Sequence, residues 1–335
     1  MKRIFFAAMA SMASVPPGHA ESTITASSVE DCQADIEVVL TAFLPPMPAD
    51  SDITDADMAK LYADAPVEYR DGRCVLDQFS TRSLYMPPGM ERSFVIGPVN
   101  WQAEWSGAGR VFPPSALSLR VEGFRQKFSA GPEMAEFAYM QNVIIGQQNG
   151  ALQLEFRSDP QARSLELTRL EITPNGTDRL VLSAKLTDIN LPDIAGGPRV
   201  SISDLLRIGV TDIELSLTNR GFFQSMVGMW LQAVYPRMGE TPEQAVEAAQ
   251  TKARDFIATI PATLATDDSR AALTALIDSL PQPSGDLHLA LHAPDGLTAG
   301  KIAPATVVSG PSWQLLEEPL RDVRIEAEWT PAPAP

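Results

Sequence analysis

Histidine and cysteine are scarce in this chain. Its 335 residues include three histidines and two cysteines. The sequence contains no zinc signature, nucleophile elbow, phosphate-binding loop or dinucleotide fingerprint, which argues against a Ser-His-Asp hydrolase or a nucleotide-dependent enzyme. His288 and His292 lie in a strand-like stretch, where four residues separate two rings by about 13 Å, too far for one ion. We therefore expect no metal and no cofactor.

Positive charge is also in short supply. Lys and Arg number 26 against 42 Asp and Glu, which leaves a formal net charge of -16. Such an acidic surface is repelled by phosphate backbones, so nucleic acid is not an expected partner.

Long hydrophobic runs are missing apart from one near the start. Lys2 and Arg3 precede an apolar run from Ile4 to Val15, and Gly18-His19-Ala20 follows. The run is too short for a stable membrane anchor, and the arrangement is that of a secretory signal peptide. We expect residues 1–20 to be cleaved after Ala20 and the mature protein to be periplasmic.

The two cysteines predict a disulfide. Cys32 and Cys74 form an even pair in an oxidising compartment, without the C-x-x-C spacing of a metal or redox site. They lie in residues 21–90, a mixed segment with helical spacing at Asp35–Leu44 and Asp52–Tyr62. The disulfide would tie this segment together.

Alternating apolar and polar residues begin near Phe94 and return repeatedly. Val99, Trp101, Ala103 and Trp105 fall on one face of the first such stretch. The later stretches are Leu117–Val121, Leu152–Phe156, Leu165–Ile172, Leu180–Leu186, Ile213–Leu217, Leu287–Leu291 and Val323–Trp329. Strands with one apolar face are typical of antiparallel sheets covered on a single side. Turn signals such as Pro174-Asn175-Gly176 and Pro294-Asp295-Gly296 separate them.

A helical block interrupts the strands at residues 222–283. Thr241, Pro242 and Gln244 predict a capping box at the start of one helix, and another helix is expected to follow Asp267 or Asp268. A third, Phe222–Tyr235, has hardly any polar face. It is interpreted as a core helix on the sheet, or alternatively as a lid or a lipid-facing element.

These patterns predict an α+β protein. A large, curved antiparallel β-sheet with one apolar face would comprise residues 91–221 and 284–329. The helical insertion at 222–283 would cover it, the mixed N-terminal segment would carry the disulfide, and residues 330–335 would form a Pro/Ala tail.

The expected function is noncatalytic, because the strands supply more apolar face than one short helix can cover. We expect a groove between sheet and helices that binds a lipid, another apolar ligand or a lipid-modified partner. In pattern alone the chain resembles periplasmic lipid-handling proteins, in which a half-open sheet shields acyl chains behind helices. The residues expected along the groove, each of which could equally be a core residue, are Trp101, Trp105, Phe222, Phe223, Met226 and Trp230.

Two alternatives stay open. One is an assembly module that binds another envelope protein through a strand edge or the helical block. The other is a hydrolase that uses two of the many carboxylates, although spacing singles out no pair.

Overall fold

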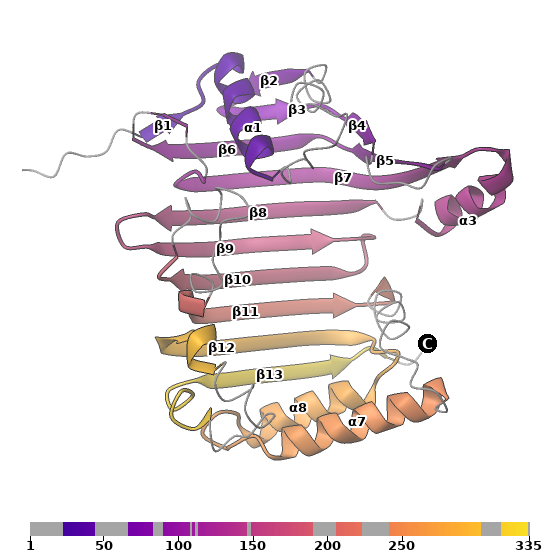
Figure 1. Cartoon of the computed structure of the whole chain (residues 1–335), viewed down its shortest axis with the longest axis vertical. Coiled ribbons are helices and arrows are strands. Elements are labelled where there is room, and N and C mark those ends of the chain that lie inside the picture. Colours follow the sequence, from indigo (N-terminus) through magenta and orange to yellow (C-terminus); the bar gives the residue numbers. More distant parts are fainter. Residues whose placement is uncertain are drawn as a thin grey trace, which may run out of the picture.

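An antiparallel β-sheet dominates the computed structural model of the chain (Figure 1). The structure describes residues 23–43, 66–82, 90–107, 109–110, 113–145, 149–189, 206–222, 241–302 and 316–333. Within these ranges thirteen strands form one sheet, and every pair of neighbouring strands is antiparallel. The predicted large antiparallel sheet is confirmed.

Most of the sheet is a meander in which consecutive strands are neighbours. It comprises β6 (Val99–Ser106), β7 (Ala116–Ala130), β8 (Gly150–Asp159), β9 (Ser164–Thr173), β10 (Arg179–Thr187), β11 (Gly209–Asn219), β12 (Gly285–Thr298) and β13 (Arg324–Pro331). The strands before it are β1 (Thr23–Thr25), β2 (Val67–Arg70), β3 (Arg73–Leu76), β4 (Phe79–Arg82) and β5 (Met90–Ile96). The path runs from β13 to β2, so over the described residues the sheet is open.

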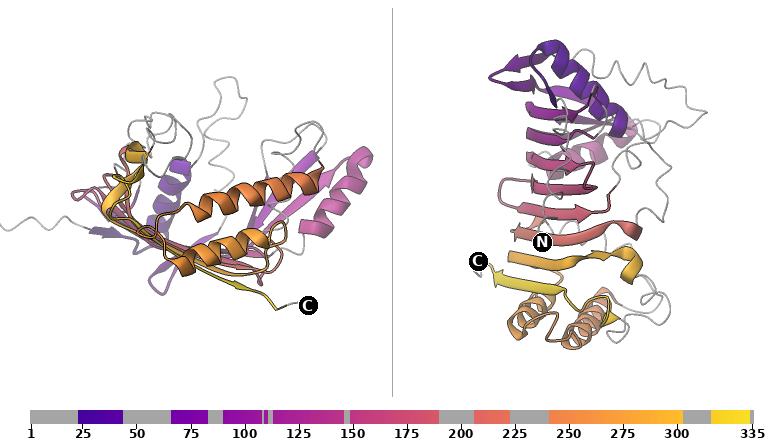
Figure 2. Two further views of the ribbon diagram at one scale, coloured as in Figure 1. Left: turned by 90° about the horizontal axis from the view of Figure 1, so that it is seen from below. Right: turned by 90° about the vertical axis from the view of Figure 1, so that its left-hand side faces the viewer.

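The helices lie near the two ends of the sheet. Helix α1 (Val29–Phe43) contacts β2 and β3, while α7 (Pro242–Ala258) and α8 (Asp267–Asp278) pack together at the β13 end. The first view of Figure 2 shows the strands bending into a trough, with α1, α7 and α8 toward its concave side. Helix α3 (Ala135–Ile145), preceded by the short turn η1 (Pro132–Met134), packs on the extension of β7.

The predicted capping box at Thr241 is confirmed, and the helix expected after Asp267 or Asp268 is present but starts slightly earlier. Thr241 Oγ1 accepts a hydrogen bond from Gln244 N at 3.3 Å, and Gln244 Oε1 accepts one from Thr241 N at 3.1 Å. Helix α8 begins at Asp267, after the N-cap Thr266. The helices expected at 52–62 and, beyond Phe222, at 223–235 lie outside the described residues, as does the signal peptide.

Two sequence expectations need correction. The first helix starts at Val29, earlier than Asp35, because Ser28 Oγ accepts a hydrogen bond from Asp31 N at 3.2 Å and caps it. Pro294-Asp295-Gly296 does not separate two strands. It lies within β12, where Asp212 pairs with His292 and Val210 pairs with Leu297. The extra residues of β12 form an irregular bulge inside a continuous strand.

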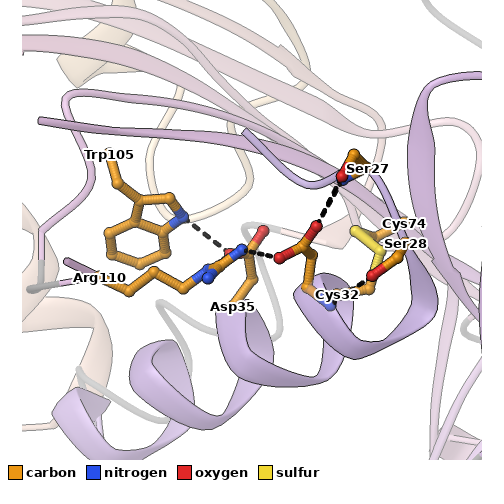
Figure 3. The surroundings of a disulfide bond; sticks show 8 residues. Ser27, Ser28, Cys32, Asp35, Cys74, Trp105 and Arg110 are labelled. Atoms are coloured by element: carbon orange, nitrogen blue, oxygen red, sulfur yellow. Dashed lines mark hydrogen bonds and ion pairs between the residues drawn. A yellow bond between two sulfur atoms is a disulfide. The ribbon is translucent and has the colours of Figure 1, made fainter. Parts of the chain in front are cut away.

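The predicted disulfide links the N-terminal helix to the sheet. Cys32 on α1 and Cys74 on β3 are bonded, with their Cα atoms 5.4 Å apart and no exposed surface (Figure 3). This pairing confirms the expected Cys32–Cys74 bridge. It holds α1 against the strands at this end.

A buried carboxylate reinforces the same contact. Asp35 on α1 accepts hydrogen bonds from Trp105 Nε1 at 2.8 Å and from Arg110 Nε at 2.6 Å (Figure 3). Arg110 also binds Asp31 at 2.7 Å. Burial raises the pKa of Asp35 above its ordinary value, against the opposing effect of the two hydrogen bonds. The guanidinium thus compensates a carboxylate that has no contact with water.

The disulfide should contribute measurably to stability. The two cysteines are 42 residues apart in sequence, and closing such a loop restricts the unfolded chain by about 4 kcal/mol. Cys32→Ser combined with Cys74→Ser should lower the free energy of unfolding by roughly this amount in urea titrations followed by circular dichroism. Reducing agent should lower the wild-type value equally and leave the double variant unchanged. A wild-type protein insensitive to reduction would contradict the assignment.

Candidate ligand-binding surface

The strand register aligns apolar residues of successive strands into rows that cross the sheet. The first row consists of Trp101, Leu119, Leu154, Leu170, Leu182, Leu215, Leu289 and Ala327. Directly paired residues of antiparallel strands have their side chains on the same face. All eight side chains therefore lie on one side of the sheet.

Parallel rows lie on either side of the first. One consists of Ala103, Leu117, Phe156, Leu167, Ala184, Ile213, Leu291 and Ile325. Another consists of Val99, Val121, Leu152, Ile172, Leu180, Leu217, Leu287 and Trp329. A shorter fourth row consists of Leu165, Leu186, Val210 and Leu297.

Residues near both ends of the rows lie in or against buried hydrophobic clusters. At the β6 end, Trp101 and Trp105 are 4% and 0% exposed and belong to clusters that also contain Ile36 and Val38 of α1. At the β12–β13 end, residues of α7, α8 and the loop between them pack against both strands. This cluster includes Ile257, Ile260, Leu264, Ala293 and Val323.

The middle of the rows is different. We define the central apolar surface as the row residues of β9, β10 and β11. They are Leu165, Leu167, Leu170, Ile172, Leu180, Leu182, Ala184, Leu186, Val210, Ile213, Leu215 and Leu217. Among the described residues, none of these twelve is fully buried and none belongs to a buried core cluster. Ile172 remains 37% exposed.

The opposite face of the same strands is polar. Glu171 on β9 accepts hydrogen bonds from Arg179 Nε at 2.7 Å and Arg169 Nε at 2.9 Å. These interactions, led by the one from Arg179, outweigh partial burial and lower the pKa of Glu171 to about 2. Asp212 binds His292 Nδ1 at 2.9 Å, which lowers the pKa of Asp212. Water-facing charges thus occupy the side away from the central apolar surface.

The predicted site residues that the structure describes do not lie on the central apolar surface. Trp101 and Trp105 lie in the N-terminal core. Phe222 lies three residues after the end of β11, and its N–H donates to Asp178 Oδ1 at 3.3 Å. Phe223, Met226 and Trp230 lie outside the described residues.

Asp178 accepts hydrogen bonds from the backbone just after the end of β11. It is 2% exposed and accepts hydrogen bonds from the Asn175 amide at 2.6 Å and from the backbone N–H of Arg220. Burial alone would raise the pKa of Asp178, but these hydrogen bonds lower it below its ordinary value. The start of the helical insertion is therefore fixed beside the turn between β9 and β10.

The central leucines were missed as site residues although their alternation was recognised. Period-two spacing marks Leu182 or Leu215 as facing the sheet's apolar side, like Trp101. The spacing does not indicate which part of that face the helices cover. Only the three-dimensional packing distinguishes the central leucines from the core residue Trp101.

The described residues bear on two other features, a metal site and a membrane-spanning helix. No group of His, Cys, Asp and Glu side chains there could hold a metal ion. No helix there is both long and apolar enough to cross a membrane. No protein-family model and no curated protein sequence matches the chain.

Shortening a leucine side chain should lower the free energy of unfolding more in the core than on the central apolar surface. Leu264→Ala, in the α7–α8 core at 4% exposure, should cost about 2–5 kcal/mol of unfolding free energy. Leu182→Ala should cost less than about 1 kcal/mol in protein freed of ligand, because less contact is lost. Urea denaturation measures both. An equal cost would mean that Leu182 is part of a closed core.

The Glu171 cluster should make stability depend on acidity. The pKa of Glu171 in the folded protein is about 2, below the ordinary value. The ionised Glu171 therefore stabilises the fold above about pH 4.5, and this stabilisation is lost as the pH falls toward 2. Glu171→Gln should flatten this part of the stability profile, measured by denaturation at several pH values. Glu166→Gln on the same strand is the control and should leave the slope unchanged. An unaltered slope in Glu171→Gln would refute the assignment.

Proposed function

We propose that the protein is exported to the periplasm and there binds a lipid or another apolar ligand noncovalently on the central apolar surface. The observation that carries the proposal is the contrast along the rows: residues near both ends lie in or against buried clusters, and the twelve residues of the middle strands do not. The proposal assigns no catalytic residue.

The physical argument is that contact between apolar side chains and water is unfavourable in free energy. Soluble monomers rarely expose contiguous apolar patches above a few hundred Å², and larger ones mark binding sites. Each Å² removed from water contributes about 25 cal/mol. Twelve neighbouring apolar side chains on three strands therefore favour an apolar occupant.

In this proposal the sheet has one apolar face and the helices close its two ends. Helix α1, with Trp101 and Trp105, closes one end, and α7 and α8 close the other. Phe222 stands at the side, where Asp178 holds the backbone. The polar face with Glu171 and Asp212 stays in contact with water and keeps the carrier soluble.

The test is native mass spectrometry with lipid extraction, on mature protein purified from its host's periplasm without detergent. We expect a defined excess mass that extracts as lipid. Leu182→Asn with Leu215→Asn, a directly paired couple on the central surface, should remove most of it. Val181→Asn with Ser216→Asn, the adjacent couple on the other face, should retain it. If the Leu182→Asn, Leu215→Asn variant kept the bound lipid, the proposal would be wrong.

The alternative function, an envelope assembly module, predicts a clean apoprotein mass and a stable complex with another protein. Strand addition at the β13 edge is already opposed by internal contacts. Ile325 N donates to Leu264 O at 2.7 Å, and Ala327 N donates to Ser269 Oγ at 3.2 Å. These two N–H groups are not available to a partner strand.

A further inference from the structure

We propose that a second copy of this chain binds along the edge of β2 that faces away from β3, so that two sheets join across a twofold axis. This inference names a protein partner and does not depend on the apolar ligand. It follows from the hydrogen-bonding pattern of β2, from the charges on this strand and from the protection of the opposite end of the sheet.

Strand β2 ends the sheet on the side away from β13. Its neighbour is β3, and among the described residues no strand pairs with its other edge. Asp71 and Gly72 connect β2 to β3 with positive φ angles of 54° and 78°, as in a two-residue type I′ turn. In such a hairpin the flanking pair, Arg70 and Arg73, exchanges backbone hydrogen bonds.

This turn determines which backbone groups of β2 point outward. Hydrogen-bonded pairs alternate along an antiparallel ladder, so Arg70 and Glu68 bond to β3 while the N–H and C=O groups of Tyr69 and Val67 face the other way. Neither residue forms a backbone hydrogen bond to a described residue outside the sheet. A strand edge with such groups is a template for pairing with another strand.

The sequence of β2 is complementary to itself. If Tyr69 pairs with Tyr69 of a second copy, their outward backbone groups exchange two hydrogen bonds. In this antiparallel register Glu68 lies opposite the second copy's Arg70, and Arg70 lies opposite the second copy's Glu68. Opposite charges on directly paired residues favour pairing. Both side chains are exposed and form an ion pair within one chain, so they are available to the second copy. This match favours a second copy as the partner.

Helix α1 adds surface beside this edge. Cys32 is bonded to Cys74 on β3, and Asp35 further along the helix binds Trp105 on β6, so α1 begins on the β2 side of these contacts (Figure 1). Val29, its first residue, is 37% exposed. Directly paired residues share a face. The α1 helices of both copies, and both central apolar surfaces, would therefore lie on the same side of the joined sheet.

The other end of the sheet does not offer an equivalent edge. Two outward N–H groups of β13, those of Ile325 and Ala327, already donate to Leu264 and Ser269. Pro331 at the end of β13 has no N–H. Pairing of β2 with β2 uses the same surface on both copies and closes at two chains, so a dimer is expected and not a filament.

Analytical ultracentrifugation of the mature protein, with its disulfide intact, should give the mass of two chains at high concentration. Glu68→Arg places two arginines opposite each other, and Arg70→Glu does the same with two glutamates. Each change should raise the dimer dissociation constant at least about tenfold, since like charges then face each other twice in the dimer. Glu328→Arg, a charge reversal at an exposed position of β13, is the matched control and should leave the constant unchanged.

A mixture of the two variants separates the contact between copies from the ion pair within one chain. Neither Glu68→Arg nor Arg70→Glu retains the internal pair. In a mixed dimer, however, both positions again place an arginine opposite a glutamate. Native mass spectrometry of an equimolar mixture should therefore show more mixed dimer than the two uniform dimers together.

The outcomes are independent of the lipid test. A single-chain mass at every concentration overturns this inference, and so does a dimer that neither weakens in the charge variants nor prefers the mixed pair. Ligand binding is decided separately by the mass that extracts as lipid, which a monomer could carry as well as a dimer.

Discussion

Uninterrupted antiparallel pairing from β6 to β13 is the constraint on which the rest of the structure depends. A slip of one residue between any two strands would turn every later side chain to the other face. Irregularities occur at several places, for example between Leu182 and Ala184 and between Val210 and Asp212. At these two places the extra residues are absorbed, and the apolar residues beyond them still pair with apolar residues. Three of the four rows therefore cross eight strands.

Stabilising interactions are concentrated at the two ends of this sheet. The Cys32–Cys74 bridge and the Asp35–Arg110 pair hold α1 at one end. At the other, α7 and α8 supply a hydrophobic cluster, and Leu264 and Ser269 accept hydrogen bonds from β13. The strands between are joined by backbone pairing and by ion pairs on the polar face, such as Glu171 with Arg179. Packed ends thus flank middle strands whose apolar residues belong to no buried core cluster among the described residues.

This distribution links stability to the proposed function. Hydrophobic side chains that are packed inside a core cannot contact a ligand. A second group, side chains that would contact a ligand, contributes less to the stability of the ligand-free protein. Trp101 and Trp105 fall in the first group, with exposures of 4% and 0%. In the proposed function, Leu182 and Leu215 fall in the second. Ligand binding would then complete the missing part of the core and raise stability by mass action.

The sequence by itself determined the antiparallel sheet, the Cys32–Cys74 pairing and the capping box at Thr241, because each rests on a local pattern or on a forced choice of partners. It did not distinguish Trp101 from Leu182, since period-two spacing assigns both to the same face. It also marked Pro294-Asp295-Gly296 as a turn, whereas pairing with Val210 and Asp212 keeps these residues inside β12. Tertiary structure alone decided which part of the apolar face is packed. Packing depends on where helices distant in sequence come to lie, and the spacing of residues within one strand carries no information about that.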